Sequence, residues 1–389
     1  MRSLLAIAGL ILTAPVLAQE APTVPEADAP SVAAPSVAAD LPLLPPSLAD
    51  AVGRDDRGDA VEGRPITDEA MARALGAAAL RDWDLALIHA ERAAAGGQPL
   101  GATLAGHILL HGLSERGVDD EAAVRWLRRA GEAGEPDALI ILSRLATTGR
   151  GGLEPFQARA FLAQAAEGGD QRAAHEYGLY LMNEGDPGAA PQAVNWLRLA
   201  AESGRTEAFA DYAEALGDWV HGPGDLAAAR IWYERAGEAG DGLSAAIAAT
   251  MYMNGEGGEA DPEHGVQLMR MGAELGAPSA MASFALLLFQ GAPGLPADPV
   301  RAADWARRGA EAGDGEAQFL YAYALATGDG AVQDFQRAYY WARRAAAPRA
   351  SSLADDLDRA RLEAALERAL DEPVIQRLRA EAAADASGL

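Results

Sequence analysis

Residues 298–328, DPVRAADWARRGAEAGDGEAQFLYAYALATG, carry a pattern that returns along most of the chain. When the copies are aligned on Trp305, neighbouring copies lie 35 to 37 residues apart. The anchor position is occupied by His89, Trp126, Phe161, Trp196, Trp232, Leu268, Trp305 and Trp341. A period in this range is typical of solenoids built from helical hairpins, so we expect one repetitive array rather than several globular domains.

Small residues occupy fixed places in every copy. Alanine or glycine stands three residues before and four residues after each anchor, and positions seven apart lie on one face of a helix. A further small column lies in the segment that follows each anchor helix: Gly106, Ser143, Gly178, Ala213, Ala249, Ala285 and Ala322. We expect these columns to be seams where neighbouring helices approach closely, with the anchor side chains packed in the core between them.

A glycine stands eight residues after every anchor except the last. It separates the anchor helix from the segment that follows. These glycines are Gly97, Gly134, Gly169, Gly204, Gly240, Gly276 and Gly313. Glycine adopts, without steric cost, the left-handed backbone conformation that ends many helices. Each unit is therefore predicted to be a helix, a short glycine turn, a second helix and a looser loop.

The sequence AEAG or AESG at this turn, with the D-P-x-x-A-x-x-W pattern that begins at Asp298, resembles the Sel-one-like repeat family, which is related to tetratricopeptide repeats. The resemblance covers roughly 67–349, and it weakens where Pro348 and Arg349 replace the turn glycine. It implies an all-α fold, a right-handed α-solenoid of about eight helix hairpins closed by a C-terminal capping helix.

Composition divides the rest of the chain around this array. Residues 1–18 contain a charged start, an apolar run and a small-residue cleavage site, which indicates a signal peptide. Residues 19–65 form an acidic linker rich in Pro and Ala that should be disordered, the solenoid spans 66–349, a capping helix 350–372 and a C-terminal tail 373–389. We interpret the apolar cluster from Leu41 to Pro46 as ordinary linker; the alternative is a short docking motif for a partner or for the solenoid's own groove.

Charge and composition exclude several classes of function. The net charge of -25 and the pI near 4.6 argue against binding to nucleic acid or to anionic lipid, because both require a basic surface. The chain contains no Cys and no Lys, so all 32 basic residues are Arg. Disulfide scaffolds, thiolate nucleophiles, P-loop lysines and Schiff-base lysines are therefore excluded.

Two features that could indicate chemistry are better explained otherwise. His107 and His111 stand four residues apart, the spacing of half a zinc site, but neither a third ligand nor a neighbouring glutamate accompanies them. The glycine-rich stretch 255–258 follows a predicted helix rather than a strand, so it does not predict a phosphate-binding loop. We predict no catalytic, cofactor-binding or metal-binding residues.

The family resemblance implies a non-enzymatic scaffold, adaptor or regulator that binds a protein or peptide on the concave face of the solenoid. The signal peptide predicts a periplasmic or secreted protein, and no other segment is apolar enough for membrane insertion. One alternative is a hydrolase of cell-wall or β-lactam substrates, although relatives of that kind rely on disulfides that this chain lacks. Another is a structural subunit of a polysaccharide-export or envelope assembly.

The binding side is predicted on the first helix of each unit, where varied residues lie beside the uniform small column. Tyr323 and Arg144 are the expected anchors, because Tyr and Arg are enriched among residues that dominate interface energy. The alternative is that these residues are solvent-exposed and vary without a function. The predicted partner-binding residues are Thr103, His107, Arg144, His175, Asp211, Glu214, Thr250, Phe319 and Tyr323.

Overall fold

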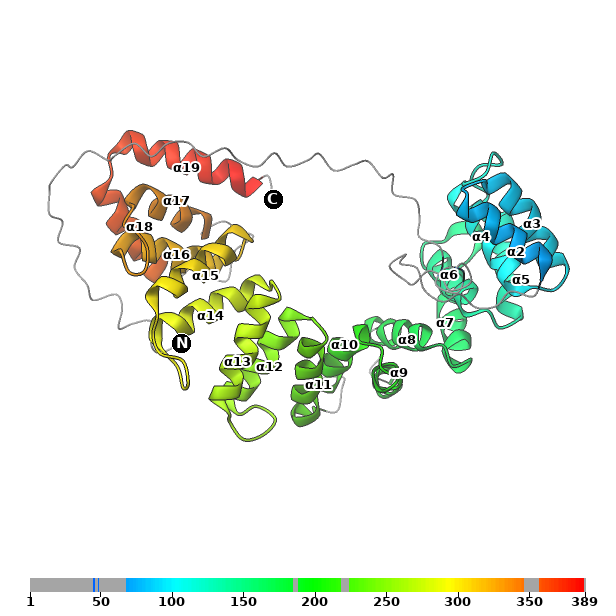
Figure 1. Cartoon of the computed structure of the whole chain (residues 1–389), viewed down its shortest axis with the longest axis horizontal. Coiled ribbons are helices and arrows are strands. Elements are labelled where there is room, and N and C mark those ends of the chain that lie inside the picture. The colour runs from blue at the N-terminus through cyan, green and yellow to red at the C-terminus, as the bar shows by residue number, and fades with distance from the viewer. Residues whose placement is uncertain are drawn as a thin grey trace. The chain divides into compact units, whose positions relative to one another are not determined.

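The computed structural model describes Pro45, Leu48 and residues 68–184, 188–217, 224–345 and 357–387. Within these residues the regular elements are helices, apart from an isolated bridge between Ala292 and Leu295 (Figure 1). The predicted all-α helical-repeat solenoid is confirmed. The predicted signal peptide and most of the predicted linker lie outside the described residues.

The helices succeed one another with short connections. They are α2 (Glu69–Ala79), α3 (Trp83–Ala95), α4 (Pro99–His111), α5 (Asp120–Glu132), α6 (Pro136–Thr147), α7 (Gln157–Glu167), α8 (Gln171–Asn183), α9 (Ala190–Glu202), α10 (Glu207–Gly217), α11 (Leu226–Glu238), α12 (Gly242–Asn254), α13 (Pro262–Glu274), α14 (Pro278–Gln290), α15 (Pro299–Glu311), α16 (Gly315–Thr327), α17 (Phe335–Ala345), α18 (Leu357–Ala369) and α19 (Glu372–Ser387), with a 3-10 turn η2 (Arg150–Gly152). Even-numbered helices from α4 to α16 are called A helices, and the odd-numbered helices that follow them, α5 to α17, are called B helices. The B helices carry the anchor residues from Trp126 to Trp341, and α3 carries His89.

The helices fall into two compact units. The N-terminal unit contains α2 to α9 and α10 as far as Ala215, and the C-terminal unit contains α11 to α19. Inside each unit successive helices pack against each other, for example α4 on α5 and α12 on α13. No helix among the described residues is long and apolar enough to cross a membrane.

Local sequence signals explain where helices begin and end. Aspartates precede most of the B helices, and the side chain of Asp298, for example, accepts a hydrogen bond from the backbone N–H of Arg301 at 3.1 Å. The turn glycines end the B helices with φ between 84° and 110°, as at Gly313, where φ is 92°. The prediction that these glycines are left-handed is therefore confirmed.

The small columns are helix seams, as predicted. Ala123, Ala193 and Ala302 are 0% exposed, and so are Ala249 and Ala322 of the A-helix column. Where glycine replaces alanine in these columns, the neighbouring helix approaches more closely than an added Cβ would allow. A Cβ at residue 178, for instance, would lie 2.7 Å from Cγ of Leu197 on the next helix.

The anchor aromatics are half-buried, which differs in part from the core packing that we expected. Trp305 packs edge-on against Phe284 of α14 at 5.8 Å between ring centroids, and the guanidinium of Arg308 lies 4.8 Å from the Trp305 ring centroid. The fully buried position is often the next residue, such as Leu127 at 0% exposure. One face of the indole therefore meets the core while an arginine one turn later covers another part of it.

Two helices cover the C-terminal end, where the sequence predicts one capping helix followed by a short helix and a tail from residue 373. Helix α19 buries Ile375, Leu378 and Ala382, which share one face of the helix, and it packs on α17. Arg379 donates to the Tyr339 hydroxyl at 2.9 Å and to the Glu367 carboxylate at 2.6 Å. This apolar stripe explains why the segment is a packed helix rather than a frayed end.

Candidate protein-binding surface

Most of the predicted partner-binding residues lie at two related positions of the A helices. His107, Arg144, Glu214, Thr250 and Tyr323 directly follow the small column, and Leu179 and Leu286 complete this set, which we call the helix-A face. Thr103, His175 and Phe319 stand four residues before members of the face, so they lie one turn away on the same side of their helices. Asp211 is three residues before Glu214 on α10.

Exposure divides the predicted set. Arg144, Glu214 and Thr250 are exposed, and Tyr323 is half-buried. Burial of Tyr323, and then the nearby Asp329 carboxylate, raises the pKa of its hydroxyl, which therefore stays protonated and can donate a hydrogen bond. Leu179 and Leu286, which the sequence analysis left out, are also half-buried. The A helices thus present charged, polar and apolar side chains beside a fully buried seam.

Four of the five remaining predicted residues are buried, which corrects their placement on an accessible surface, and Asp211 is half-buried. Thr103 is 0% exposed, His107 3%, and His175 and Phe319 8% each. The Thr103 hydroxyl donates to the carbonyl oxygen of Pro99 one turn earlier at 3.2 Å. Thr103, His175 and Phe319 stand three residues before the small column, a position that is buried in most repeats, as at Ile140 and Ala282.

His107 is held neutral by its surroundings. Burial, and then the neighbouring His111, lowers the pKa of His107 to about 3. The two imidazole rings lie 4.5 Å apart, and Nε2 of His107 is buried without a hydrogen-bond partner among the described residues. In the part of the chain that the structure describes, no three histidine or carboxylate side chains are grouped so that they could hold a metal ion.

Charged side chains connect successive A helices of the N-terminal unit. Arg144 of α6 pairs with Glu176 of α8 at 2.5 Å, and Nε2 of His175 on α8 lies 2.5 Å from a carboxylate oxygen of Asp211 on α10. The sequence analysis named Arg144, His175 and Asp211 but missed these pairings. A search for opposite charges one repeat apart could have found them, because the paired residues are 32 and 36 positions apart.

The exposed ion pair between Arg144 and Glu176 is weak, so Arg144 can exchange Glu176 for another carboxylate. The Arg144 side chain is 67% exposed and Glu176 is 30% exposed, so the pair contributes about 0–1 kcal/mol to stability. A carboxylate from a partner can replace Glu176 at little cost. The guanidinium is held in position by the pair and remains accessible.

The sequence analysis also missed a polar cluster in the C-terminal unit. The Glu234 carboxylate of α11 accepts a hydrogen bond from the Tyr252 hydroxyl at 2.6 Å and lies 2.8 Å from Nε2 of His264. Burial, followed by the hydrogen bond to Glu234, raises the pKa of Tyr252 to about 12. Since both carboxylate oxygens are engaged, the cluster connects α11, α12 and α13 rather than forming a free acid or base.

The glycine-rich loops between A and B helices pack against the preceding repeat. A Cβ at Gly257 would clash with the carbonyl oxygen of Leu226, and one at Gly330 with that of Pro299. Both carbonyls belong to the first turns of earlier B helices, α11 and α15. These glycines therefore permit close approach of two backbones.

Comparison with known proteins gives one family. The family model described as Sel1 repeat matches residues 99–135, 136–170, 171–204, 210–241, 244–276, 278–314 and 315–347. No curated protein matches this chain. The first matched repeat consists of α4 and α5, so the hairpin of α2 and α3 precedes the matched region.

Two solved structures are among those that match this chain, and the first of them shows the likeness in fold. A Sel1 repeat protein from Oxalobacter formigenes is 22% identical, with a TM-score of 0.61, over 76% of this chain and 86% of that one. The protective antigen c5321 of uropathogenic Escherichia coli, which displays an SLR fold, is 20% identical, with a TM-score of 0.49, over 77% of this chain and 79% of its own. Because the repeat model accounts for well over half of its residues, the chain belongs to the Sel1 repeat family.

Proposed function

We propose that the protein is a non-enzymatic scaffold or adaptor that binds a protein or peptide partner through the helix-A face. The observation that carries this proposal is the contrast between adjacent positions of the A helices. The small column is buried in every repeat, as at Ala249 and Ala322, whereas the next residue is accessible in every repeat except on α4 and changes chemistry from one repeat to the next. Uniform seams beside varied accessible side chains are what a solenoid specialised for one partner requires.

Within the face, the accessible members contribute most to the proposed contact. Arg144 and Glu214 offer charge in the N-terminal unit, and Thr250, Leu286 and Tyr323 offer mixed contacts in the C-terminal unit. Arginine and tyrosine combine large contact area with directional hydrogen bonds, which is why they dominate many interfaces. Thr103 and His107 are not included, because their side chains are buried.

The test uses single and paired alanine variants of the mature chain. We expect Arg144→Ala with Tyr323→Ala to weaken binding of a co-purified partner by about 2 kcal/mol, measured by calorimetry, while helicity and thermal midpoint stay unchanged. Arg125→Ala and Arg301→Ala, which remove exposed arginines of the B helices, are the matched controls. Equal affinity of the double variant and the controls would show that the partner binds elsewhere.

We further propose that the chain is exported and acts in the periplasm or outside the cell. The support is the charged start, apolar run and small-residue site within residues 1–18. N-terminal sequencing of the protein recovered from a periplasmic fraction should begin at Gln19. If the protein were instead a hydrolase, the purified mature chain should hydrolyse a chromogenic β-lactam. The scaffold proposal predicts that it does not.

A further inference from the structure

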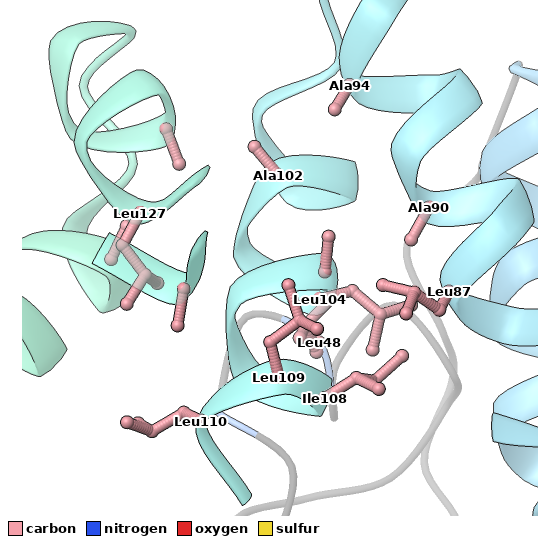
Figure 2. Packing of buried hydrophobic residues seen from close by; sticks show 14 of the residues in the cluster. Leu48, Leu87, Ala90, Ala94, Ala102, Leu104, Ile108, Leu109, Leu110 and Leu127 are labelled. Atoms are coloured by element: carbon pink, nitrogen blue, oxygen red, sulfur yellow. The ribbon is translucent and has the colours of Figure 1, made fainter. Parts of the chain in front are cut away.

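A leucine from outside the repeats is buried in the N-terminal unit. Leu48 is 0% exposed and is among the largest fully buried side chains of the described chain. Figure 2 shows it beside Leu104 and Leu109 of α4, with Leu87 of α3 and Ile108 nearby, and these residues belong to one hydrophobic cluster. The sequence therefore supplies this cluster with a side chain that no repeat position carries.

The residues around Leu48 give its mode of contact. Pro45 is also buried, and the Leu48 backbone N–H donates to the Pro45 carbonyl oxygen at 2.9 Å, which closes one turn. The sequence of this turn is Pro-Pro-Ser-Leu, at the end of the apolar cluster that was interpreted as ordinary linker. Of the cluster from Leu41 to Pro46 the structure describes Pro45, which is buried like the nearby Leu48.

The site lies where the helix-A face is closed. Every residue of α4 from Gly101 to Leu110 is buried, and His107 is the buried member of a face whose other described members are accessible. At the opposite end of the chain, covering residues such as Leu366 come from α18 and α19, which follow the last repeat directly. Leu48, in contrast, is joined to α2 by a tether of roughly twenty residues that includes Gly53, Gly58 and Gly63.

We propose that the cluster of Leu87, Leu104, Ile108 and Leu109 is a peptide-binding site for a leucine presented in a Pro-Pro-x-Leu turn by a partner protein, and that the chain's own Pro45–Leu48 turn is its intramolecular competitor. Because roughly twenty residues join Leu48 to α2, the resident turn has a high effective concentration at the site, and a partner peptide must bind tightly or be abundant to displace it. This cluster is a different surface from the helix-A face of the middle repeats, so a negative result here would not contradict the proposed scaffold function.

The chain contains no cysteine, so a single introduced thiol reports on the site. In Leu48→Cys we expect the thiol to react with a disulfide reagent at least tenfold more slowly than in Val332→Cys, a control at a position that is 89% exposed. A synthetic peptide with the sequence of residues 41–50, LPLLPPSLAD, should raise the Leu48→Cys rate to within about twofold of the control, by competition for one site. The same peptide with aspartate in place of its last leucine should have no effect.

Three outcomes would overturn the proposal. Equal labelling of Leu48→Cys and Val332→Cys without peptide would show that the turn is not seated. Protection that persists at saturating peptide would make Leu48 a permanent core residue, and protection that rises with protein concentration would assign the site to the turn of a second copy. As a second measurement, a fluorescently labelled form of the same peptide should bind Leu48→Ala at least tenfold more tightly than it binds the unmodified chain. Circular dichroism should confirm that both proteins are folded.

Discussion

Gly272→Ala tests whether helix spacing in the array is set by the small columns. Gly272 lies inside α13, and an added Cβ would be 2.7 Å from the Gly242 carbonyl oxygen and 3.0 Å from Cβ of Ala280. Ordinary van der Waals contact begins at 3.4 Å, and neither atom can rotate away. The helix-propensity gain of alanine over glycine is about 1 kcal/mol, whereas overpacking a core costs about 1–3 kcal/mol. We therefore expect a net loss of up to about 2 kcal/mol.

The matched control is Gly76→Ala. Gly76 is exposed in the middle of α2, and an added Cβ there meets nothing within 4 Å. Only the propensity term remains, so this variant should gain about 0.5–1 kcal/mol. The two substitutions are chemically identical and are expected to have opposite signs.

Hydrogen exchange followed by mass spectrometry resolves such local effects better than a global melt, because repeat arrays open in parts. Amides of α12 to α14 should exchange faster in Gly272→Ala, by a factor of up to roughly 30, since 1.4 kcal/mol corresponds to a factor of ten. Amides of α2 and α3 should exchange more slowly in Gly76→Ala. If Gly272→Ala leaves exchange in α12 to α14 unchanged or slows it, the contact with Gly242 does not limit the spacing and our reasoning is wrong.

Three further predictions concern packing and pH. Ala302→Leu, at a seam position that is 0% exposed, should lower the thermal midpoint by the equivalent of about 1–3 kcal/mol. Hydrogen bonds from Tyr339 and Arg379 lower the pKa of Glu367. The Glu367 carboxylate therefore stabilises the fold fully above the pKa that it has in the unfolded chain, and this stabilisation is lost as pH falls through the lower folded value. In Glu367→Gln, exchange protection of α17 to α19 should decrease less on acidification than in the unmodified chain. The pKa of His107 is lowered to about 3 in the folded state, so between about pH 6.5 and pH 3 His107 binds a proton only in the unfolded state. The amides of α4 should therefore lose hydrogen-exchange protection as pH falls through this interval, and His107→Leu should reduce that loss.

The repeat-internal features of the fold were predictable from sequence. The turn glycines, such as Gly313, and the seam alanines, such as Ala302, are where the period placed them. Both features depend on interactions within a repeat or between neighbouring repeats, and these interactions recur with the period. One difference within a column was not predictable: Ala200 is accommodated at 0% exposure, whereas at the equivalent Gly272 the helices are too close for a Cβ.

The polar connections were only partly predictable. Arg144 and His175 were recognised as varied residues beside a seam, but their pairing with Glu176 and Asp211 requires the offset between successive A helices. The Arg379 bridge to Tyr339 and Glu367 depends on how α19 packs on α17, and no repeat pattern extends to that helix. Side-chain partners across elements are set by helix positions, which the sequence period does not specify.

The sequence by itself determined the all-α repeat architecture, its seams and its turns, because each is a local requirement repeated along the chain. Only the tertiary structure decided which parts of the helix-A face are open. His107 occupies a position whose equivalents from α6 to α16 are accessible, yet it is buried on α4, whose leucines share a hydrophobic cluster with Leu48. Burial at the ends depends on contacts with segments outside the repeats, and no periodic signal encodes contacts of that kind.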